Sequence, residues 1–353
     1  MATIILPSKL NNIELCSFEG CISLISIEID SEISAINYGT FRYCYSLLSI
    51  VIPSKVVLID SDPFYECRNL STIEIHSNLE SINSYAFYYC TCLTSIKLPE
   101  SMTKIESNAF SFCYSLQSIE IPEKVTSIGE KAFFECTNLT NVLMKSNVEV
   151  IETMLFKGCF SLQKVEILGN GTLIKSESFA QCVSLSSITI PETIEKFETR
   201  VFYECRSLLS IIIPKKVEII EKYLFYQCNK LQSVKSINYS AFYNCSSLYS
   251  ISIPDSLISI DSYAFYYCSS LPSIIIPKKM TVINDSTFCH CTSLASVEIL
   301  GEVSSILRYA FLECSSLKSF RIPKSVTLIE HGCFYYCTSL QSIIIPENVT
   351  TIE

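Results

Sequence analysis

The chain has 353 residues, of which 49% are hydrophobic and 17% charged, and its formal net charge is −9. An acidic chain without basic runs is poorly suited to the phosphate backbone of nucleic acid, so nucleic-acid binding is excluded as a function class. The longest apolar runs, such as 208–213, which Ser210 interrupts, have about six residues, whereas a membrane helix needs about twenty. The composition therefore predicts no membrane span.

One interval governs the whole chain. The pattern Phe-x-x-Cys-x-x-Leu occurs fifteen times, and thirteen of the fourteen gaps between copies share one period of 23, as from Phe18 to Phe41. The exception is a gap of 17 between Phe225 and Phe242. A fixed period of this length is typical of a solenoid, in which each unit must stack on its neighbours to bury its apolar face.

A coil that begins at each Leu of the pattern accounts for every residue. Fourteen coils have the full length of one period, the coil at 231–247 has a length of 17 and an incomplete last coil at 340–353 has a length of 14. We therefore expect a single solenoid domain over 1–353 with about sixteen coils.

The coil at 116–138 shows the first predicted element of the repeat, with positions counted from its Leu. Positions 4 and 6 are Ile119 and Ile121, which alternate with the polar residues Ser118 and Glu120. This alternation predicts a strand with one buried face. Pro122 at position 7 cannot donate to a strand ladder, so the strand is expected to end there.

The next two elements complete the coil. Val125 and Ile128, at positions 10 and 13, predict a second extended stretch with apolar side chains turned inward. Positions 14 to 21 then predict one or two helical turns, or an irregular turn, with Phe133 and Cys136 on one side. Stacked coils would form a parallel sheet on a concave face, a buried column of Phe and a second column of Cys, and the crossover rule favours a right-handed superhelix.

The shortened coil at 231–247 lacks positions 5 to 10, which carry the end of the strand, the Pro and the Val. We expect a pinched coil there, with a kink or a hinge. The alternative is a tolerated deletion without any role.

The string LxxIxIPxxVxxIxxxAFxxC resembles the BspA-like leucine-rich repeat, also called the Treponema pallidum type, over the whole chain. The resemblance implies a leucine-rich-repeat solenoid. It also implies a relationship to surface proteins of host-associated bacteria and anaerobic protists that are linked to adhesion and to binding of matrix or other proteins. It brings no catalytic motif. Because we recognise neither a signal peptide nor an anchor, both the cell surface and the cytoplasm remain open as locations.

Nineteen cysteines could indicate a disulfide framework, but fifteen of them are the repeated position 21. Thiols in successive coils point the same way about one rung apart, which does not match disulfide geometry. We therefore expect buried free thiols. The four additional cysteines are Cys16, Cys92, Cys289 and Cys333.

A metal site could be built from Cys289, His290 and Cys291, with His331, Cys333 and Cys337 two coils further along. The CxxC pairs of structural zinc sites are absent. The fifteen cysteines at position 21, which we call the ladder cysteines, are expected to face the core. The chain has only three histidines, and His76, His290 and His331 occupy different positions of the repeat. We expect no metal, no cofactor and no enzymatic activity.

Position 5 of the first strand is expected to be exposed, and it is the best candidate for a partner-binding row. Glutamates alternate there with apolar residues in the first half of the chain, and the second half is more apolar. The alternative is the ordinary strand propensity of β-branched residues. The candidate residues are Glu28, Val51, Glu74, Glu120, Leu143, Glu166, Ile212, Ile275 and Ile344.

Tyrosines form a second candidate surface after the repeated Phe, or a half-buried structural ridge. Position 19 holds Tyr203, Tyr226, Tyr243 and Tyr266, and position 20 holds Tyr43, Tyr89, Tyr267 and Tyr336.

Both ends of the chain lack a polar cap, which leaves three readings: a tolerated exposed rung, end-to-end self-association, or a fragment.

The leading functional hypothesis is a non-enzymatic protein-binding scaffold, an adhesion-type surface antigen by resemblance, whose partner is a protein such as a host or matrix protein. An intracellular scaffold for protein–protein interaction is the alternative.

Overall fold

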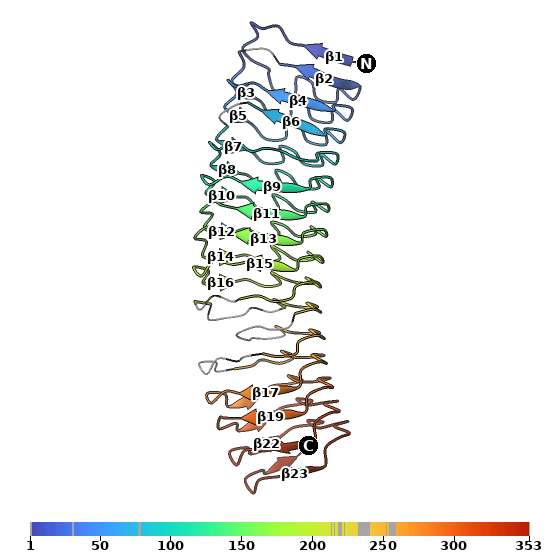
Figure 1. Cartoon of the computed structure of the whole chain (residues 1–353), viewed down its shortest axis with the longest axis vertical. Helices are drawn as coiled ribbons and strands as arrows, with labels where there is room; N and C mark the ends of the chain where they lie inside the picture. The colour runs from blue at the N-terminus through green and yellow to red at the C-terminus, as the bar shows by residue number, and fades with distance from the viewer. Residues whose placement is uncertain are drawn as a thin grey trace. The chain divides into compact units, whose positions relative to one another are not determined.

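The structure is a computed structural model, and it describes residues 2–29, 32–76, 79–212, 214, 216–217, 221, 223–231, 241–251, 253 and 259–352. The chain divides into two compact units, Met1–Ile194 and Glu195–Glu353. Each unit is a stack of coils that carry short parallel strands (Figure 1).

The first unit has two kinds of strand, as the two extended stretches of the repeat predict. A long strand occupies positions 3 to 6 of most coils and a short strand occupies positions 12 and 13. The long strands are β1 (Ala2–Ile5), β2 (Leu24–Glu28), β4 (Ser49–Ile52), β6 (Thr72–Ile75), β9 (Ser118–Ile121), β11 (Asn141–Met144), β13 (Lys164–Ile167) and β15 (Ser187–Thr189). The short strands are β3 (Ala35–Ile36), β5 (Leu58–Ile59), β7 (Ser81–Ile82), β8 (Lys104–Ile105), β10 (Ser127–Ile128), β12 (Val150–Ile151) and β14 (Leu173–Ile174).

The pairings of the first unit join equivalent positions of successive coils in parallel. The long strands form two sheets, β1-β2-β4-β6 and β9-β11-β13-β15, because the described coil between them has no long strand. The short strands β3, β5, β7, β8 and β10 form one sheet that continues past that coil. Paired residues are one full repeat apart in sequence, as Ile50 is from Ile73 and Val142 from Val165.

The second unit repeats this plan where it is described. Its long strands are β17 (Ser273–Ile276), β19 (Ser296–Ile299), β21 (Ser319–Arg321) and β23 (Ser342–Ile344). Its short strands are β16 (Lys196–Phe197), β18 (Val282–Ile283), β20 (Ser305–Ile306), β22 (Leu328–Ile329) and β24 (Thr351–Ile352). The pairs β17-β19 and β21-β23 and the sheet β18-β20-β22-β24 are parallel.

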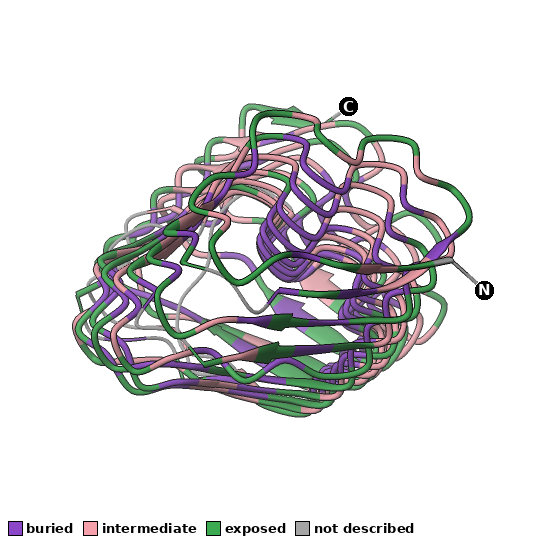
Figure 2. Ribbon diagram, turned by 90° about the horizontal axis from the view of Figure 1, so that it is seen from above, coloured by how far each residue is buried: buried purple, intermediate pink, exposed green. Residues whose placement is uncertain are grey.

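The predicted columns form the core of each unit, and buried residues gather on the inner side of the coils (Figure 2). The repeated Phe rings stack almost parallel in successive coils: the centroid of Phe133 lies 5.4 Å from that of Phe110 and 5.4 Å from that of Phe156. Buried ladder thiols donate hydrogen bonds to Phe carbonyls of the preceding coil, as Cys136 Sγ does to Phe110 O at 3.2 Å. These thiols are therefore buried, as predicted, and they also satisfy a backbone acceptor.

Of the two alternatives for positions 14 to 21, the structure has the irregular turn and not the helical turns, because the described residues contain no helix. Positions 16 and 20 are left-handed wherever the structure describes them, as at Lys131 (φ 58°) and Glu135 (φ 52°). A residue with this φ ends a right-handed helix. The segment forms successive tight turns instead: Phe134 N donates to Lys131 O at 3.0 Å, while Phe133 N donates to Leu155 O of the next coil at 3.0 Å.

The part of the chain that the structure describes has about 14 turns of about 23 residues, slightly fewer than the sixteen coils predicted. The prediction counted the shortened coil at 231–247 and the incomplete coil at 340–353 along with the fourteen full-length repeats. The pinched coil, kink or hinge expected in the shortened coil falls on 232–240, which lies outside the described residues.

Candidate functional site

The long-strand face of the first unit carries a row of outward side chains at position 5. Because side chains alternate along a strand, burial of positions 4 and 6 turns position 5 to solvent. On β9, Ile119 and Ile121 are buried while Glu120 is exposed. The outer row of this unit, as we call it, contains the predicted residues Glu28, Val51, Glu74, Glu120, Leu143 and Glu166.

The structure brings the predicted row residues of the first unit together in two groups. Val51 on β4 pairs with Glu74 on β6, which places an apolar and an acidic side chain on neighbouring strands. Leu143 on β11 pairs with Glu120 on one side and with Glu166 on the other. The second group is therefore a leucine between two carboxylates.

A hollow of about 330 Å³ lies on this second group. Its walls include predicted residues and two that sequence reasoning missed, Asn141 and Lys164. Lys164 forms an ion pair with Glu166, and Lys145 forms one with Glu120. The lining residues are Ser118, Ile119, Glu120, Asn141, Val142, Leu143, Lys164 and Glu166.

The sequence held a signal for both missed residues. Position 3 is Ser in twelve coils, and Asn141 and Lys164 interrupt that column in consecutive coils. Larger polar side chains at two adjacent rungs raise one wall of the hollow, whereas serine leaves the sheet surface low. The replacement of a repeated serine by larger residues in two consecutive coils was thus the sequence signal for this hollow.

The remaining predicted row residues belong to the second unit. Ile212 is 73% exposed, Ile275 on β17 is 52% exposed and Ile344 on β23 is 80% exposed. Two of them have charged strand neighbours, since Ile275 pairs with Glu298 and Ile344 pairs with Arg321. The described strands therefore show single exposed isoleucines beside charges rather than a continuous apolar row.

The tyrosines predicted at position 19 form a stack in the second unit. The ring centroids are 4.7 Å apart for Tyr203 and Tyr226, 5.3 Å for Tyr226 and Tyr243, and 4.8 Å for Tyr243 and Tyr266. All four side chains are half-buried. This arrangement matches the half-buried structural ridge, which was the alternative to a second candidate surface. Turns and not a helix carry the stacked rings.

The position-20 tyrosines do not form a comparable column. Tyr43 and Tyr89 lie in the first unit, and Tyr267 and Tyr336 lie in the second. Tyr267 stacks on His290, with centroids 4.1 Å apart, while Tyr336 is exposed beside Tyr335. Each of these rings occupies a left-handed backbone position, so its direction is set by the turn.

An aromatic cluster in the first unit was not predicted as a unit. The guanidinium carbon of Arg42 lies 4.9 Å from the centroid of Tyr43 and 4.8 Å from that of Tyr65. Tyr65 in turn stacks on Tyr88, with centroids 4.8 Å apart. All four side chains are half-buried, and cation–π contacts of this kind contribute about 0.5–1 kcal/mol each.

The buried thiols have the properties of core groups and not of nucleophiles. Burial raises the pKa of the Cys44 and Cys333 thiols to about 12 and that of the Cys136 thiol well above its usual range. A thiol with a raised pKa stays protonated at neutral pH, which weakens it as a nucleophile and lets it donate to a carbonyl. Cys92 is exposed.

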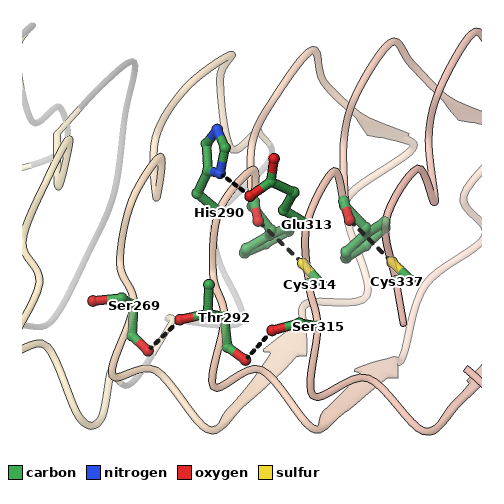
Figure 3. Close-up of polar contacts among 9 residues, drawn as sticks. Ser269, His290, Thr292, Glu313, Cys314, Ser315 and Cys337 are labelled. Carbon is green, nitrogen blue, oxygen red and sulfur yellow. Dashed lines mark hydrogen bonds and ion pairs between the residues drawn. The ribbon is translucent and has the colours of Figure 1, made fainter. Parts of the chain in front are cut away.

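His290 and Cys337, two of the residues considered for a metal site, have separate partners (Figure 3). His290 Nδ1 lies 2.9 Å from a carboxylate oxygen of Glu313, and Cys337 Sγ donates to Phe311 O at 3.2 Å. Cys291 Sγ donates to Phe265 O at 3.2 Å. In the part of the chain that the structure describes, no three His, Cys, Asp or Glu side chains gather in a way that could hold a metal ion.

The three histidines also have unrelated surroundings. His76 Nε2 lies 3.3 Å from Glu74 in the first unit, whereas His331 packs edge-on against Tyr309 in the second.

Within the described ranges, no helix is both long and apolar enough to cross a membrane.

The comparisons with known proteins agree with this architecture. The family model described as the BspA type leucine-rich repeat region matches residues 1–90, 57–185, 150–236 and 235–353. A crystal structure of a leucine-rich repeat protein from Bacteroides ovatus is 28% identical, with a TM-score of 0.72, and the match covers 97% of this chain and 92% of that one.

Two further solved structures are similar in sequence. A leucine-rich cell surface protein from Faecalibacterium prausnitzii is 27% identical over 97% of this chain and 86% of that one, with a TM-score of 0.49. The leucine-rich repeat protein of T. pallidum is 26% identical over 52% of this chain and 77% of that one, with a TM-score of 0.40. No curated protein matches the chain.

Proposed function

Because the chain belongs to the BspA-type leucine-rich repeat family, we propose that it is a non-enzymatic protein-binding scaffold whose partner docks on the long-strand face of the first unit. The observation that carries this proposal is the hollow around Glu120, Leu143 and Glu166. Protein-binding surfaces typically have an apolar centre and a polar rim. The hollow has the same composition on a small scale, because one apolar side chain lies between charged ones.

The framework beneath that surface supports the proposal. Hydrogen bonds join β11 to both neighbouring strands, and the apolar side chains of positions 4 and 6 anchor each strand in the core. A surface that is already ordered loses little conformational entropy on binding. The core thiols beneath this face are buried and stay protonated at neutral pH, which weakens them as nucleophiles.

The finer role that we propose is adhesion at a cell surface, as the resemblance to adhesion-linked surface proteins implies. Intracellular scaffolding is the second candidate. Surface protease shaving of intact cells distinguishes them, because a surface protein is cleaved while a cytoplasmic control protein stays intact. Protection of the chain under those conditions would contradict the surface role.

The partner-binding face is tested by reversing two charges. We expect Glu74→Lys combined with Glu120→Lys to alter the set of proteins captured from cell or matrix extract, because both carboxylates face outward on the row. Thermal stability should be unchanged, since surface substitutions of this kind stay within about 0.5 kcal/mol. The readout is quantitative mass spectrometry of captured proteins.

The matched control for that experiment is Glu123→Lys, an exposed residue beside Pro122 that lies off the row. It changes the net charge of the same coil without changing the long-strand face. Capture that is identical for the wild type and the double variant would reject this face as the partner site.

A further inference from the structure

The four glutamates of the outer row in the first unit stand in alternate coils. They are Glu28, Glu74, Glu120 and Glu166, and we call them the acidic row. Each of them lies two full repeats after the one before it. The intervening position-5 residues are Val51, Lys97 and Leu143. The carboxylates therefore recur with twice the period of the fold.

The stacking of the coils converts this sequence period into a distance. Parallel strands lie about 4.8 Å apart, so alternate coils place their carboxylates about 9.6 Å apart. The coil between β6 and β9 lacks a long strand, but its short strand β8 pairs with β7 and β10 in unbroken register. The register of the coils is thus maintained from Glu74 to Glu120.

This spacing discriminates among the conformations of a partner chain that runs across the strands. A polyproline II helix has three residues per turn and rises about 3.1 Å per residue, so every third residue recurs on one side after about 9.3 Å. An α-helix brings a residue back to the same side after seven residues and about 10.5 Å. A β-strand does so after two residues and about 6.7 Å.

Any difference between the repeat distance of the partner and the spacing of the carboxylates adds up along the row. Over its three intervals a polyproline II segment drifts by less than about 1 Å, whereas an α-helix drifts by about 3 Å. Resting on the function proposed above, we propose that the acidic row binds a basic polyproline II segment that carries Lys or Arg at every third residue. Four such residues in a segment of ten would face the four glutamates.

The apolar neighbours of the row are consistent with this partner, whereas its basic neighbours oppose it. Val51 is 45% exposed and Leu143 lines the hollow, so both can contact the proline rings between the basic residues. Lys145 and Lys97 are exposed near the row and would repel the same partner. Lys164 and His76 pair with Glu166 and Glu74, so the partner's cations must compete with them. The Lys145 to Glu120 pair has side chains 50% and 61% exposed, and exposed pairs of this kind contribute little to stability. An incoming cation can therefore displace or share it.

The test uses the full chain and two synthetic peptides of identical composition, measured by isothermal titration calorimetry. One is a twelve-residue peptide of four Lys-Pro-Pro triplets. The other has two lysines at each end and eight consecutive prolines between them. We expect the triplet peptide to bind at least about fivefold more tightly, because only its lysines match all four carboxylates at about two- to fivefold per contact. Equal binding, or no binding of the triplet peptide, overturns the proposal.

Variants of the chain give opposite expected shifts. Glu120→Gln should weaken triplet-peptide binding about two- to fivefold, whereas Lys145→Met should strengthen it. Glu123→Gln, in the same coil but off the row, should leave it unchanged. Effects that follow net charge alone, with Glu123→Gln equal to Glu120→Gln, would overturn the match of spacing.

A third peptide tests the conformation of the partner. It is an alanine-rich helix with Lys at every seventh residue and the same number of charges. Tighter binding of this helix than of the triplet peptide overturns the polyproline II assignment. If the triplet peptide fails while Glu74→Lys with Glu120→Lys still changes protein capture, the partner chemistry is wrong and the docking face stands.

Discussion

At the scale of single residues, the ladder cysteine is the most constrained group of the repeat. Its thiol lies in the core and donates to a Phe carbonyl of the preceding coil, as Cys159 Sγ does to Phe133 O at 3.2 Å. Sequence alone predicted the burial from the fixed position in each coil. It could not predict the hydrogen bond, because the direction of a thiol depends on where the neighbouring backbone lies.

The raised thiol pKa values predict a loss of stability at alkaline pH. A thiol ionises near pH 8.5 in the unfolded chain, whereas burial raises the pKa of Cys44 and Cys333 to about 12. Between these values the unfolded state releases protons that the folded state retains, so the free energy of unfolding falls as the pH rises. Denaturant unfolding under reducing conditions from pH 7 to pH 9.5 measures this slope.

Single substitutions assign that slope to the core thiols. Cys136→Ala removes one buried thiol, so it should make the pH dependence shallower, whereas Cys92→Ser at an exposed site should not change it. A free energy of unfolding that is constant from pH 8 to pH 9.5 would refute the role of these thiols in the pH dependence.

At the scale of elements, the two strands of most coils were predictable, and the turn was predictable only as one of two alternatives. Alternation at Ile119 and Ile121 and the position of Pro122 place the long strand and its end. Positions 14 to 21 carry apolar residues at helical spacing, which also suits the observed turns. The left-handed positions have no sequence signature, since they hold Tyr, Glu, Lys or His as well as glycine.

Those left-handed residues predict a stabilising substitution. A non-glycine residue in this region costs roughly 1–2 kcal/mol, which glycine avoids, although glycine adds about 0.4–1 kcal/mol of entropy to the unfolded chain. We therefore expect Lys131→Gly to raise the free energy of unfolding by up to about 1 kcal/mol. Lys124→Gly, at a position without left-handed φ, should lower it. Chemical denaturation of both variants decides the matter, and destabilisation by Lys131→Gly contradicts the prediction.

The candidate site was predictable only in part for a similar reason. Strand alternation identifies Glu120, Leu143 and Glu166 as outward residues, because a period of two fixes the side on which they lie. The hollow depends on the size of side chains on three neighbouring strands, each of which is one repeat away from the next in sequence. Asn141 and Lys164 acquire their role from that neighbourhood and not from their own coil.

At the scale of the whole molecule, each unit is held together by contacts between successive coils. Phe133 is fully buried and stacks between two equivalent rings, so Phe133→Ala should lower the free energy of unfolding by about 3–5 kcal/mol. Phe160→Ala, at a side chain that is 43% exposed, should cost much less. Equal effects of the two variants would contradict a shared aromatic core.

Hydrogen exchange provides a second readout of the Phe133 variant. Because a coil contacts only its neighbours, amides of the coils on either side of Phe133 should lose protection before those several coils away. A uniform loss of protection across the first unit would instead show that the unit opens as one cooperative block.

The two-coil period of the acidic row constrains how such a chain can lengthen. Duplication of one coil between Glu74 and Glu120 would keep every strand paired, yet it would separate the carboxylates by three rungs and put them out of phase. Duplication of two coils would restore the two-coil period and add one more carboxylate to the row. Growth in pairs would therefore conserve the recognition surface, whereas growth by single coils would conserve only the fold.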